Sequence, residues 1–395
     1  MRAPVDPFRK ARGQPRTAPS DAPSEATLAG TACRLHARIK GFSEFLRAGA
    51  VAVGDEPDRP DAGTASQGGV RRWPPSSLAE TATPVVRSKA PGDRRRNQLR
   101  VPAGPANTLD GGRGPAANNE DRNVPARPPE GADRGYIIPI GGAEDKLNNP
   151  AILERFIEIC GGESAHVAII PTASELEDTG PHYERLFRGF GVAGAEVLPI
   201  VDRADCESDA AQEALERADG VFLTGGNQLR LSTTLGGTAV ARLIRRRNAA
   251  GMHVAGTSAG AAFLPEHMIA GGYEGSTPSP DMVTLAPGLG LTNHLIVDQH
   301  FRQRDRLGRL LTALAYNPFA VGVGLDEDTA AFLAPDGVLE VVGSGGITVV
   351  DPSGIAYSSM DKAHRSDPVS LIGVTLHILV SGGRFDMTSR VAEAG

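Results

Sequence analysis

Short apolar segments alternate with amphipathic segments through the middle of this 395-residue chain. The apolar segments have the length of buried strands, and the segments between them repeat their apolar residues with helical spacing. This alternation is typical of an α/β fold with a doubly wound, mostly parallel sheet and flanking helices. The expected strands are 136–140, 166–171, 195–200, 219–224, 253–257 and 293–299, and the expected helices are 149–160, 180–190, 208–217, 227–235 and 238–250.

The pattern changes after a helix expected near 303–316. Short apolar segments then follow one another with turn residues such as Pro335-Asp336-Gly337 between them, which favours hairpins over crossover helices. We therefore expect a short antiparallel C-terminal extension. Its expected strands are 320–325, 330–333, 338–342 and 346–350, with a closing strand at 371–380 that is paired either within the subunit or at a dimer interface.

The first third of the chain differs in composition from the rest. Residues 1–133 hold 21 of the 41 Lys and Arg residues, 15 of the 47 Asp and Glu residues and 17 of the 30 prolines. A segment of this composition buries too little apolar surface to offset its chain entropy. We expect 1–133 to be a disordered Pro/Arg/Gly-rich extension, with one amphipathic helix at most, at 31–53. The folded domain is expected to span 134–395.

A serine lies between two glycines immediately after the expected strand 253–257. In Gly256-Thr257-Ser258-Ala259-Gly260 the small residues allow a sharp strand-to-helix turn that projects the Ser258 hydroxyl. The amide of Ala259, at the start of the following helix, would help to stabilise an oxyanion. An ordinary small-residue turn has the same composition, so the motif alone leaves both interpretations open.

A second backbone amide for the oxyanion is expected from the glycine pair after the strand 219–224. Glycine lets the backbone approach a ligand closely, and the amide of Gly226 is the expected partner of Ala259. The alternative is a turn that needs glycine only for its dihedral angles.

A serine nucleophile needs a base and an acid that orients the base. Among the nine histidines, His300 follows the apolar segment 295–297 and precedes an arginine-rich segment, where functional groups gather in α/β folds. Three adjacent acids, Asp326, Glu327 and Asp328, end a later apolar strand, and such a run is unfavourable unless it is solvated or used. A capping histidine and a solvated acidic turn are the alternative interpretations.

From about residue 136 to residue 386 the chain resembles cyanophycinases, serine exopeptidases related to aspartyl dipeptidases. The resemblance implies that Ser258 is the nucleophile, His300 the base and Glu327 the orienting acid. The chain order Ser, His, Glu also differs from that of α/β-hydrolases. The motifs that carry the resemblance are Gly141-Gly142-Ala143-Glu144-Asp145-Lys146, Thr224-Gly225-Gly226-Asn227-Gln228, Gly256-Thr257-Ser258-Ala259-Gly260, Asp298-Gln299-His300-Phe301 and Gly324-Leu325-Asp326-Glu327-Asp328-Thr329-Ala330.

The resemblance also implies a substrate. The family cleaves cyanophycin, a polyaspartate chain with arginine on each side-chain carboxylate, to β-Asp-Arg dipeptides through an acyl-enzyme. Arginines beside a catalytic histidine can hold carboxylates bidentately, although an arginine-rich helix face is more often solvated. The implied substrate-binding residues are Gln228, Asp298, Gln299, Arg304, Arg306 and Arg309.

Other features limit the cofactors and partners. The chain has no His-Glu-x-x-His or Cys-x-x-Cys spacing, so we expect neither a metal nor another cofactor. Basic runs such as Arg94-Arg95-Arg96 are short and lack interleaved aromatic residues, which indicates no nucleic-acid partner. No apolar run reaches the about 18 residues of a membrane span, so we expect no membrane partner and a cytoplasmic location.

The resemblance implies a homodimer that binds cyanophycin polymer or Asp-containing peptides. Two other functions stay open: an aspartyl dipeptidase with the same three residues and a narrower site, and an inactive homologue that binds acidic peptides. The presence of Ser258, His300 and Glu327 together speaks against the inactive homologue.

Overall fold

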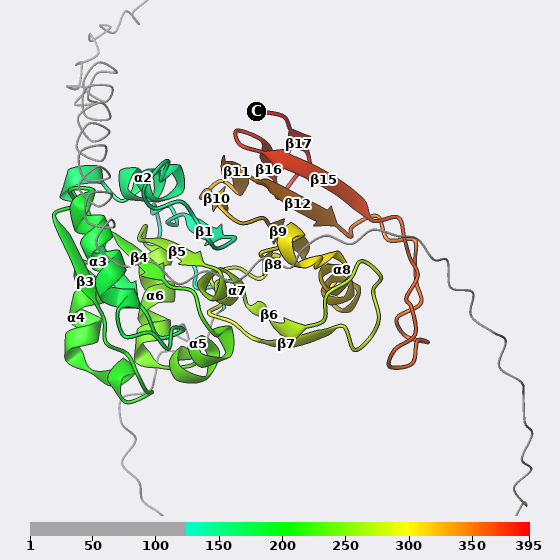
Figure 1. Cartoon of the computed structure of the whole chain (residues 1–395), viewed down its shortest axis with the longest axis horizontal. Coiled ribbons are helices and arrows are strands. Elements are labelled where there is room, and N and C mark those ends of the chain that lie inside the picture. The colour runs from blue at the N-terminus through cyan, green and yellow to red at the C-terminus, as the bar shows by residue number, and fades with distance from the viewer. Residues whose placement is uncertain (1–123) are drawn as a thin grey trace, which may run out of the picture. The chain divides into compact units, whose positions relative to one another are not determined.

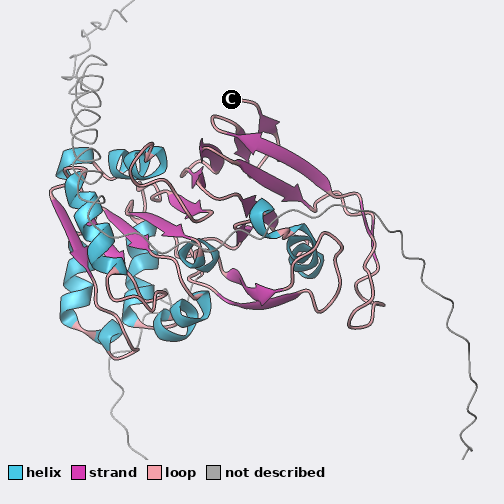
Figure 2. Ribbon diagram, viewed as in Figure 1, coloured by secondary structure: helices cyan, strands magenta, loops and turns pink. Residues whose placement is uncertain are grey.

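The computed structural model describes residues 124–395, and Figures 1 and 2 show the arrangement of this part of the chain. The disorder predicted for 1–133 falls mostly, and the helix predicted at 31–53 wholly, on residues 1–123, which lie outside the described residues. Residues 124–136 contain no helix or strand, and the first strand begins at Ile137.

A nine-stranded sheet runs through the described part of the chain in the order β17-β16-β11-β10-β1-β5-β4-β2-β3. Five neighbouring strands are parallel, and those at the centre are buried on both faces, as central strands between helical layers must be. The predicted doubly wound parallel sheet is confirmed. The parallel strands are β1 (Ile137–Ile140), β5 (His253–Thr257), β4 (Gly220–Leu223), β2 (His166–Ile170) and β3 (Gly194–Val197).

Helices cover both faces of the parallel strands (Figure 2). Successive residues of a strand point to opposite faces, so Val167 and Ile169 pack with α2 and α3, whereas Ala168 and Ile170 pack with α4, α5 and α6. Side-chain caps begin the last three of these helices. The helices are α2 (Ala151–Ile159), α3 (Thr179–Gly189), α4 (Asp209–Arg217), α5 (Gln228–Leu235) and α6 (Ala239–Ala249), and short 3-10 turns lie at Gly162–Ser164 and Asp205–Glu207.

Four antiparallel strands extend the sheet beyond β1. Strand β10 pairs with β1, with Ile137 opposite Leu333, and the later strands follow outward from it. The expected antiparallel C-terminal extension is therefore present. These strands are β10 (Thr329–Leu333), β11 (Val338–Gly343), β16 (Arg384–Asp386) and β17 (Ala392–Glu393).

A second, four-stranded sheet has the order β15-β12-β9-β8. Strands β8 and β9 are parallel, and a 3-10 turn at Arg302–Arg304 and helix α8 (Leu307–Tyr316) connect them. The sequence predicts 293–299 as a further strand of the parallel sheet, but β8 joins the second sheet because β10 occupies the position next to β1. The strands are β8 (Leu295–Gln299), β9 (Val321–Leu325), β12 (Gly346–Asp351) and β15 (Thr375–Val380).

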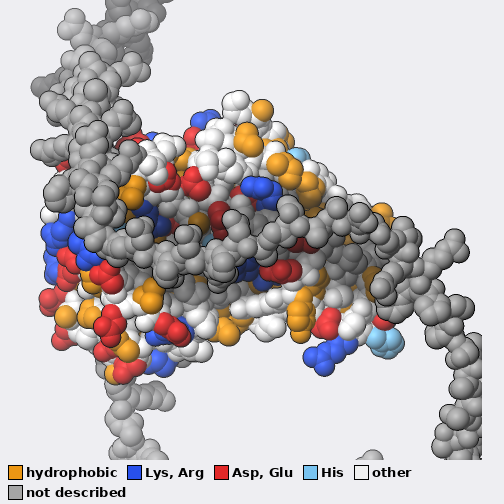
Figure 3. All heavy atoms as spheres, in the orientation of Figure 1, with side chains coloured by type: hydrophobic (Ala, Val, Ile, Leu, Met, Phe, Trp, Pro, Cys, Tyr) orange, Lys and Arg blue, Asp and Glu red, His pale blue; other side chains and the backbone are white. Residues whose placement is uncertain are grey.

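The expected closing strand at 371–380 is divided in two. Gly373 has a φ of +92° and separates β14 (Leu371–Ile372) from β15, which pairs with β12 of the same chain. The outer side chains of β15, Leu376, Ile378 and Val380, are exposed, and hydrophobic side chains line this region in Figure 3.

Two hairpins were not predicted from the sequence. They are β6 (His267–Gly272) with β7 (Val283–Pro287), and β13 (Tyr357–Ser358) with β14. Across residues 124–395, no helix combines the length and the apolar character that crossing a membrane requires.

Candidate active site

Ser258 lies at the sharp turn between β5 and the short helix α7 (Ala259–Phe263). Its φ of 52° and ψ of −108° lie in a region that residues with side chains rarely adopt. A Cβ on Gly256 would lie 2.5 Å from the carbonyl carbon of Gly260, and a Cβ on Gly260 would lie 2.3 Å from the carbonyl oxygen of Leu223. The Gly-x-Ser-x-Gly spacing therefore has a steric reason at both glycines.

Three side chains that are distant in sequence form a chain of hydrogen bonds. Ser258 Oγ lies 2.9 Å from His300 Nε2, and His300 Nδ1 lies 2.6 Å from Glu327 Oε1. His300 directly follows β8 with a φ of 48°, and Glu327 lies in the turn between β9 and β10. In this arrangement a carboxylate can orient an imidazole that takes the proton of a hydroxyl.

The three adjacent acids have different partners. Asp326 accepts hydrogen bonds from the backbone amide and from Nε of Arg302, both at 3.1 Å. Asp328 accepts a hydrogen bond from the backbone amide of Asp145 at 2.8 Å. Of the three carboxylates, only that of Glu327 reaches the imidazole. Separate donors for each carboxylate offset the repulsion that three adjacent acids would otherwise suffer.

Burial has the largest effect on the protonation of His300. Desolvation lowers the pKa of His300 below its ordinary value of 6.5, and the positive charge of Arg304 acts in the same direction. The hydrogen bond to Glu327 opposes this shift and only partly cancels it. The imidazole is therefore neutral at pH 7 and is able to accept a proton.

Gly142, in the loop after β1, leaves the space in which the ring of His300 lies. Its φ is +97°, and a Cβ at this position would lie 2.5 Å from Cε1 and 2.6 Å from Nε2 of His300. Sequence reasoning gave this residue no role, and the signal that could have found it is the glycine pair at the end of the first strand.

Replacement of Gly142 by alanine is expected to lower kcat by roughly 10- to 100-fold with little change in KM, because the new methyl group displaces the imidazole from Ser258. Steady-state kinetics on a peptide substrate measure this. Gly237→Ala is the matched control, since Gly237 has a φ of +74° and no atom lies within 4 Å of the place that its new methyl group would take, so it adds backbone strain alone. Equal losses in the two variants would contradict the steric explanation.

The loop after β4 lies beside the serine. A Cβ on Gly225 would lie 3.3 Å from Cβ of Ser258. Gly226 has a φ of +141°, and a Cβ there would lie 2.1 Å from the carbonyl oxygen of Ala173, so only glycine fits. Ala259 is the first residue of α7, and its amide therefore has no acceptor within that helix. The structure brings both expected donor segments next to Ser258.

Two of the six residues expected to bind substrate are accessible. Gln228, at the start of α5, is half-buried, and its Nε2 donates hydrogen bonds to the carbonyl oxygens of Ile269 and Ala270 at 3.2 and 3.1 Å. These two hydrogen bonds hold the side chain against β6 through its Nε2, and its Oε1 makes no hydrogen bond to that strand. Arg304 is exposed, and its charge acts on His300.

The other four are buried in one network behind the His300 turn. Arg309 holds both carboxylate oxygens of Asp298, with Nε at 2.6 Å from Oδ2. Arg306 Nη1 donates to the backbone oxygen and to Oε1 of Gln299 at 2.5 and 3.0 Å. Asp298 is 1% exposed and Arg309 4% exposed, and burial lowers the pKa of Arg306 to about 10. These side chains face one another rather than solvent.

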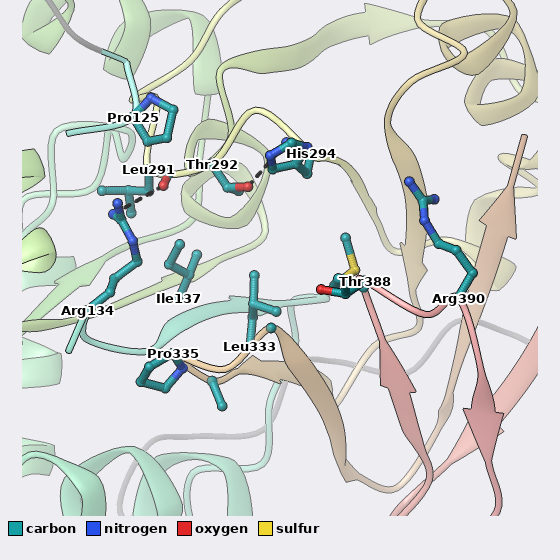
Figure 4. Close-up of a pocket in the computed structure, with 13 residues that line it drawn as sticks. Pro125, Arg134, Ile137, Leu291, Thr292, His294, Leu333, Pro335, Thr388 and Arg390 are labelled. Carbon is teal, nitrogen blue, oxygen red and sulfur yellow. Dashed lines mark hydrogen bonds between the residues drawn. The ribbon is translucent and has the colours of Figure 1, made fainter. Parts of the chain in front are cut away.

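A hollow of about 520 Å³ lies where strand β1 of the main sheet begins and the antiparallel strand β10 ends (Figure 4). Its wall includes Ile137, where β1 begins, and Leu333, where β10 ends, with Arg134 beside them. Ser258 and His300 come directly after the C-terminal ends of β5 and β8, whereas the hollow lies where the parallel strand β1 begins. Neither residue lines the hollow. The hollow is therefore separate from the candidate active site.

Comparison with known proteins identifies a peptidase family and several similar proteins. Residues 137–341 match the model of peptidase family S51. A cyanophycinase of Trichormus variabilis is 43% identical over 271 residues, which cover 68% of this chain and 91% of the relative. A cyanophycinase of Geminocystis herdmanii is 42% identical over 264 residues, 66% of this chain and 97% of the relative, and one of Thermosynechococcus vestitus is 41% identical over 262 residues, 66% and 81%.

The chain therefore belongs to peptidase family S51, and it is a serine peptidase. The resemblance that the sequence motifs indicated is confirmed by these matches. The matched range 137–341 includes Ser258, His300 and Glu327.

Proposed function

We propose that this chain is an exopeptidase that hydrolyses the backbone of cyanophycin and releases β-Asp-Arg dipeptides. The observation that carries the proposal is the identity of 41–43% to relatives named cyanophycinase over about two thirds of the chain. The hydrogen-bonded arrangement of Ser258, His300 and Glu327 supports it, because peptide hydrolysis by a serine enzyme needs a nucleophile, a base and an orienting acid.

In the first step, Nε2 of His300 takes the proton of Ser258 Oγ as this oxygen attacks the carbonyl carbon between two aspartate units. The carbon–nitrogen bond then breaks, and His300 gives its proton to the leaving amine. Glu327 keeps the ring in the tautomer that leaves Nε2 free to accept. A water molecule, deprotonated by His300, attacks the carbonyl carbon of the resulting ester. The bond from this carbon to Ser258 Oγ then breaks, His300 returns the proton to Oγ, and the dipeptide leaves with a free carboxylate.

Backbone amides of Gly226 and Ala259 are proposed to hold the oxyanion that forms in each step. Donors that are already oriented in the folded protein need no reorganisation when charge develops on the carbonyl oxygen. Removing one such donor in a serine peptidase costs about 10²–10³ in kcat. Both proposed donors are backbone N–H groups, so among substitutions only one to proline would remove either of them.

Gln228 and Arg304 are proposed to contact the substrate directly. Arg304 is exposed and carries the positive charge that a substrate carboxylate needs, and Oε1 of Gln228 is an acceptor suited to a substrate amide or guanidinium. We propose that the buried network behind the turn that carries His300 makes no contact with the substrate and instead supports this turn. Its members are Asp298, Gln299, Arg306 and Arg309.

The test is to incubate the full chain with insoluble cyanophycin and to identify soluble products by mass. Release of β-Asp-Arg is expected, and polyaspartate without arginine is the matched control that should stay intact. Cleavage of short Asp-containing peptides without release from the polymer would overturn cyanophycin as the substrate and favour a dipeptidase. The homodimer, the cytoplasmic location and the disorder of the N-terminal extension stay predictions of the sequence.

A further inference from the structure

Glu144 is a buried carboxylate beside the strand that ends at the nucleophile's turn. It is 3% exposed and belongs to the loop between β1 and α2. Its Oε2 accepts a hydrogen bond at 2.6 Å from Oγ1 of Thr257, the residue before Ser258. Its Oε1 accepts a hydrogen bond from the Tyr183 hydroxyl and lies 3.0 Å from Lys146 Nζ. The mechanism proposed above gives this carboxylate no role.

Both carboxylate oxygens of Glu144 have partners. A buried carboxylate is costly unless it is neutralised and its lone pairs are satisfied. Lys146 supplies the opposite charge and also donates to the backbone oxygen of Glu144 at 3.1 Å. Burial, together with the adjacent carboxylate, raises the pKa of Tyr183 well above its ordinary value, so the phenol stays protonated and donates.

The end of β1 and the loop after it, which carries Glu144, also contact all three turns of the candidate triad. Backbone oxygens of the three successive residues 140–142 accept hydrogen bonds from the amides of Ser258, His300 and Asp328, at 2.9, 2.9 and 2.8 Å. One short segment thus connects the turn of the nucleophile, the turn of the base and the turn of the acid.

Strained backbone is concentrated at the same turns. Four of the six non-glycine residues with positive φ in residues 124–395 lie there: Ala143, Ser258, His300 and Asp328 have φ values between 48° and 52°, a region that is costly for residues with a Cβ. Such residues persist only where the surrounding structure fixes them by several contacts. For Ser258, two such contacts are the hydrogen bond from its amide to the backbone oxygen of Ile140 and the hydrogen bond from the neighbouring Thr257 to Glu144. Only the second of these joins two side chains.

We propose that Glu144 is a positioning residue for the nucleophile: through Thr257 it fixes the end of β5, so that Ser258 Oγ stays within hydrogen-bond distance of His300 Nε2. Glu144 acts through Thr257 and is assigned no contact with the substrate. The inference rests on the proposed function, because it takes Ser258 as the nucleophile.

The test uses two substitutions at Thr257 in the full chain. Thr257→Val keeps the shape of the side chain and removes the donor, whereas Thr257→Ser keeps the hydroxyl. The rate at which a small fluorophosphonate reacts with Ser258 is measured beside kcat and KM on cyanophycin, since this reagent is too small to depend on the rest of the substrate. Thr257→Val is expected to lower kcat and the labelling rate by roughly 10- to 100-fold at unchanged KM, and Thr257→Ser to stay within about twofold of the unsubstituted chain.

A double-mutant cycle with Glu144→Gln tests whether the two residues act together. If Glu144 acts through Thr257, the double variant should be no slower than the slower single variant. Unchanged labelling in Thr257→Val, or losses that multiply in the double variant, would overturn the inference. If Glu144→Gln fails to fold, the comparison of Thr257→Val with Thr257→Ser still tests whether the hydroxyl of Thr257 positions Ser258. If the unsubstituted chain is not labelled at Ser258, the proposed function itself fails.

Discussion

Replacing Ser258 with alanine is expected to abolish hydrolysis of cyanophycin, with a loss on the order of 10⁶-fold in kcat. The loss is large because without Oγ no acyl-enzyme can form, and His300 has no hydroxyl to deprotonate. Stability should change by less than about 0.5 kcal/mol, since alanine meets the same strain as serine at a φ of 52°. Product release followed by mass, together with urea unfolding, measures both quantities.

The control for this variant is Ser381→Ala, which alters an exposed serine in the turn after β15 and should leave turnover unchanged. Turnover retained in Ser258→Ala would refute the assignment of the nucleophile. If turnover is lost and unfolding occurs at a much lower urea concentration, the loss comes from misfolding and the role of the hydroxyl is not supported.

Replacing Arg309 with alanine is expected to lower the free energy of unfolding by about 3–5 kcal/mol. The variant leaves the carboxylate of Asp298 at 1% exposure without its bidentate partner, and Arg306, whose Nη1 lies 3.5 Å from the same carboxylate, replaces it poorly. Urea unfolding of the full chain measures the change. Activity should fall as a consequence, because Asp298 and Gln299 immediately precede His300.

Arg304→Ala is the matched control, because it removes an arginine of the same segment that is exposed. It should change the free energy of unfolding by less than about 0.5 kcal/mol and raise KM for cyanophycin. The opposite pattern, in which Arg309→Ala is as stable as the unsubstituted chain but has a raised KM, would support the substrate-binding role that the family resemblance implies for Arg309.

The sequence predicts the strands and helices of the parallel sheet well. Apolar periods and capping residues such as Ser208, Asn227 and Thr238 are local, so the ends of the five helices lie within two residues of their expected positions. The second sheet was not predicted, since a strand such as β8 carries no local mark of which neighbour it will pair with. The hairpin of β6 and β7 was missed for a different reason: its strands contain two glycines and a proline, residues that are depleted in strands, so neither segment was expected to be a strand.

For the candidate site, the sequence indicates which residues are functionally or sterically required, but it does not indicate which side chains contact one another. The glycine spacing around Ser258 has a steric cause that is visible in the motif itself. The bidentate contact between Asp298 and Arg309 is different, because it depends on how α8 is rotated against β8 after a turn in between. Whether an arginine faces substrate or a buried carboxylate is therefore decided by tertiary packing, and the same holds for the contact of Glu144 with Thr257.

The candidate triad joins two sheets that are hydrogen-bonded separately. Ser258 follows a strand of the nine-stranded sheet, His300 follows a strand of the four-stranded sheet, and Glu327 lies where the chain passes from β9 in one to β10 in the other. A partly folded molecule can therefore have both sheets complete and still be inactive. Measured activity therefore reports whether the two sheets have docked on each other. A measurement of secondary-structure content does not detect this docking.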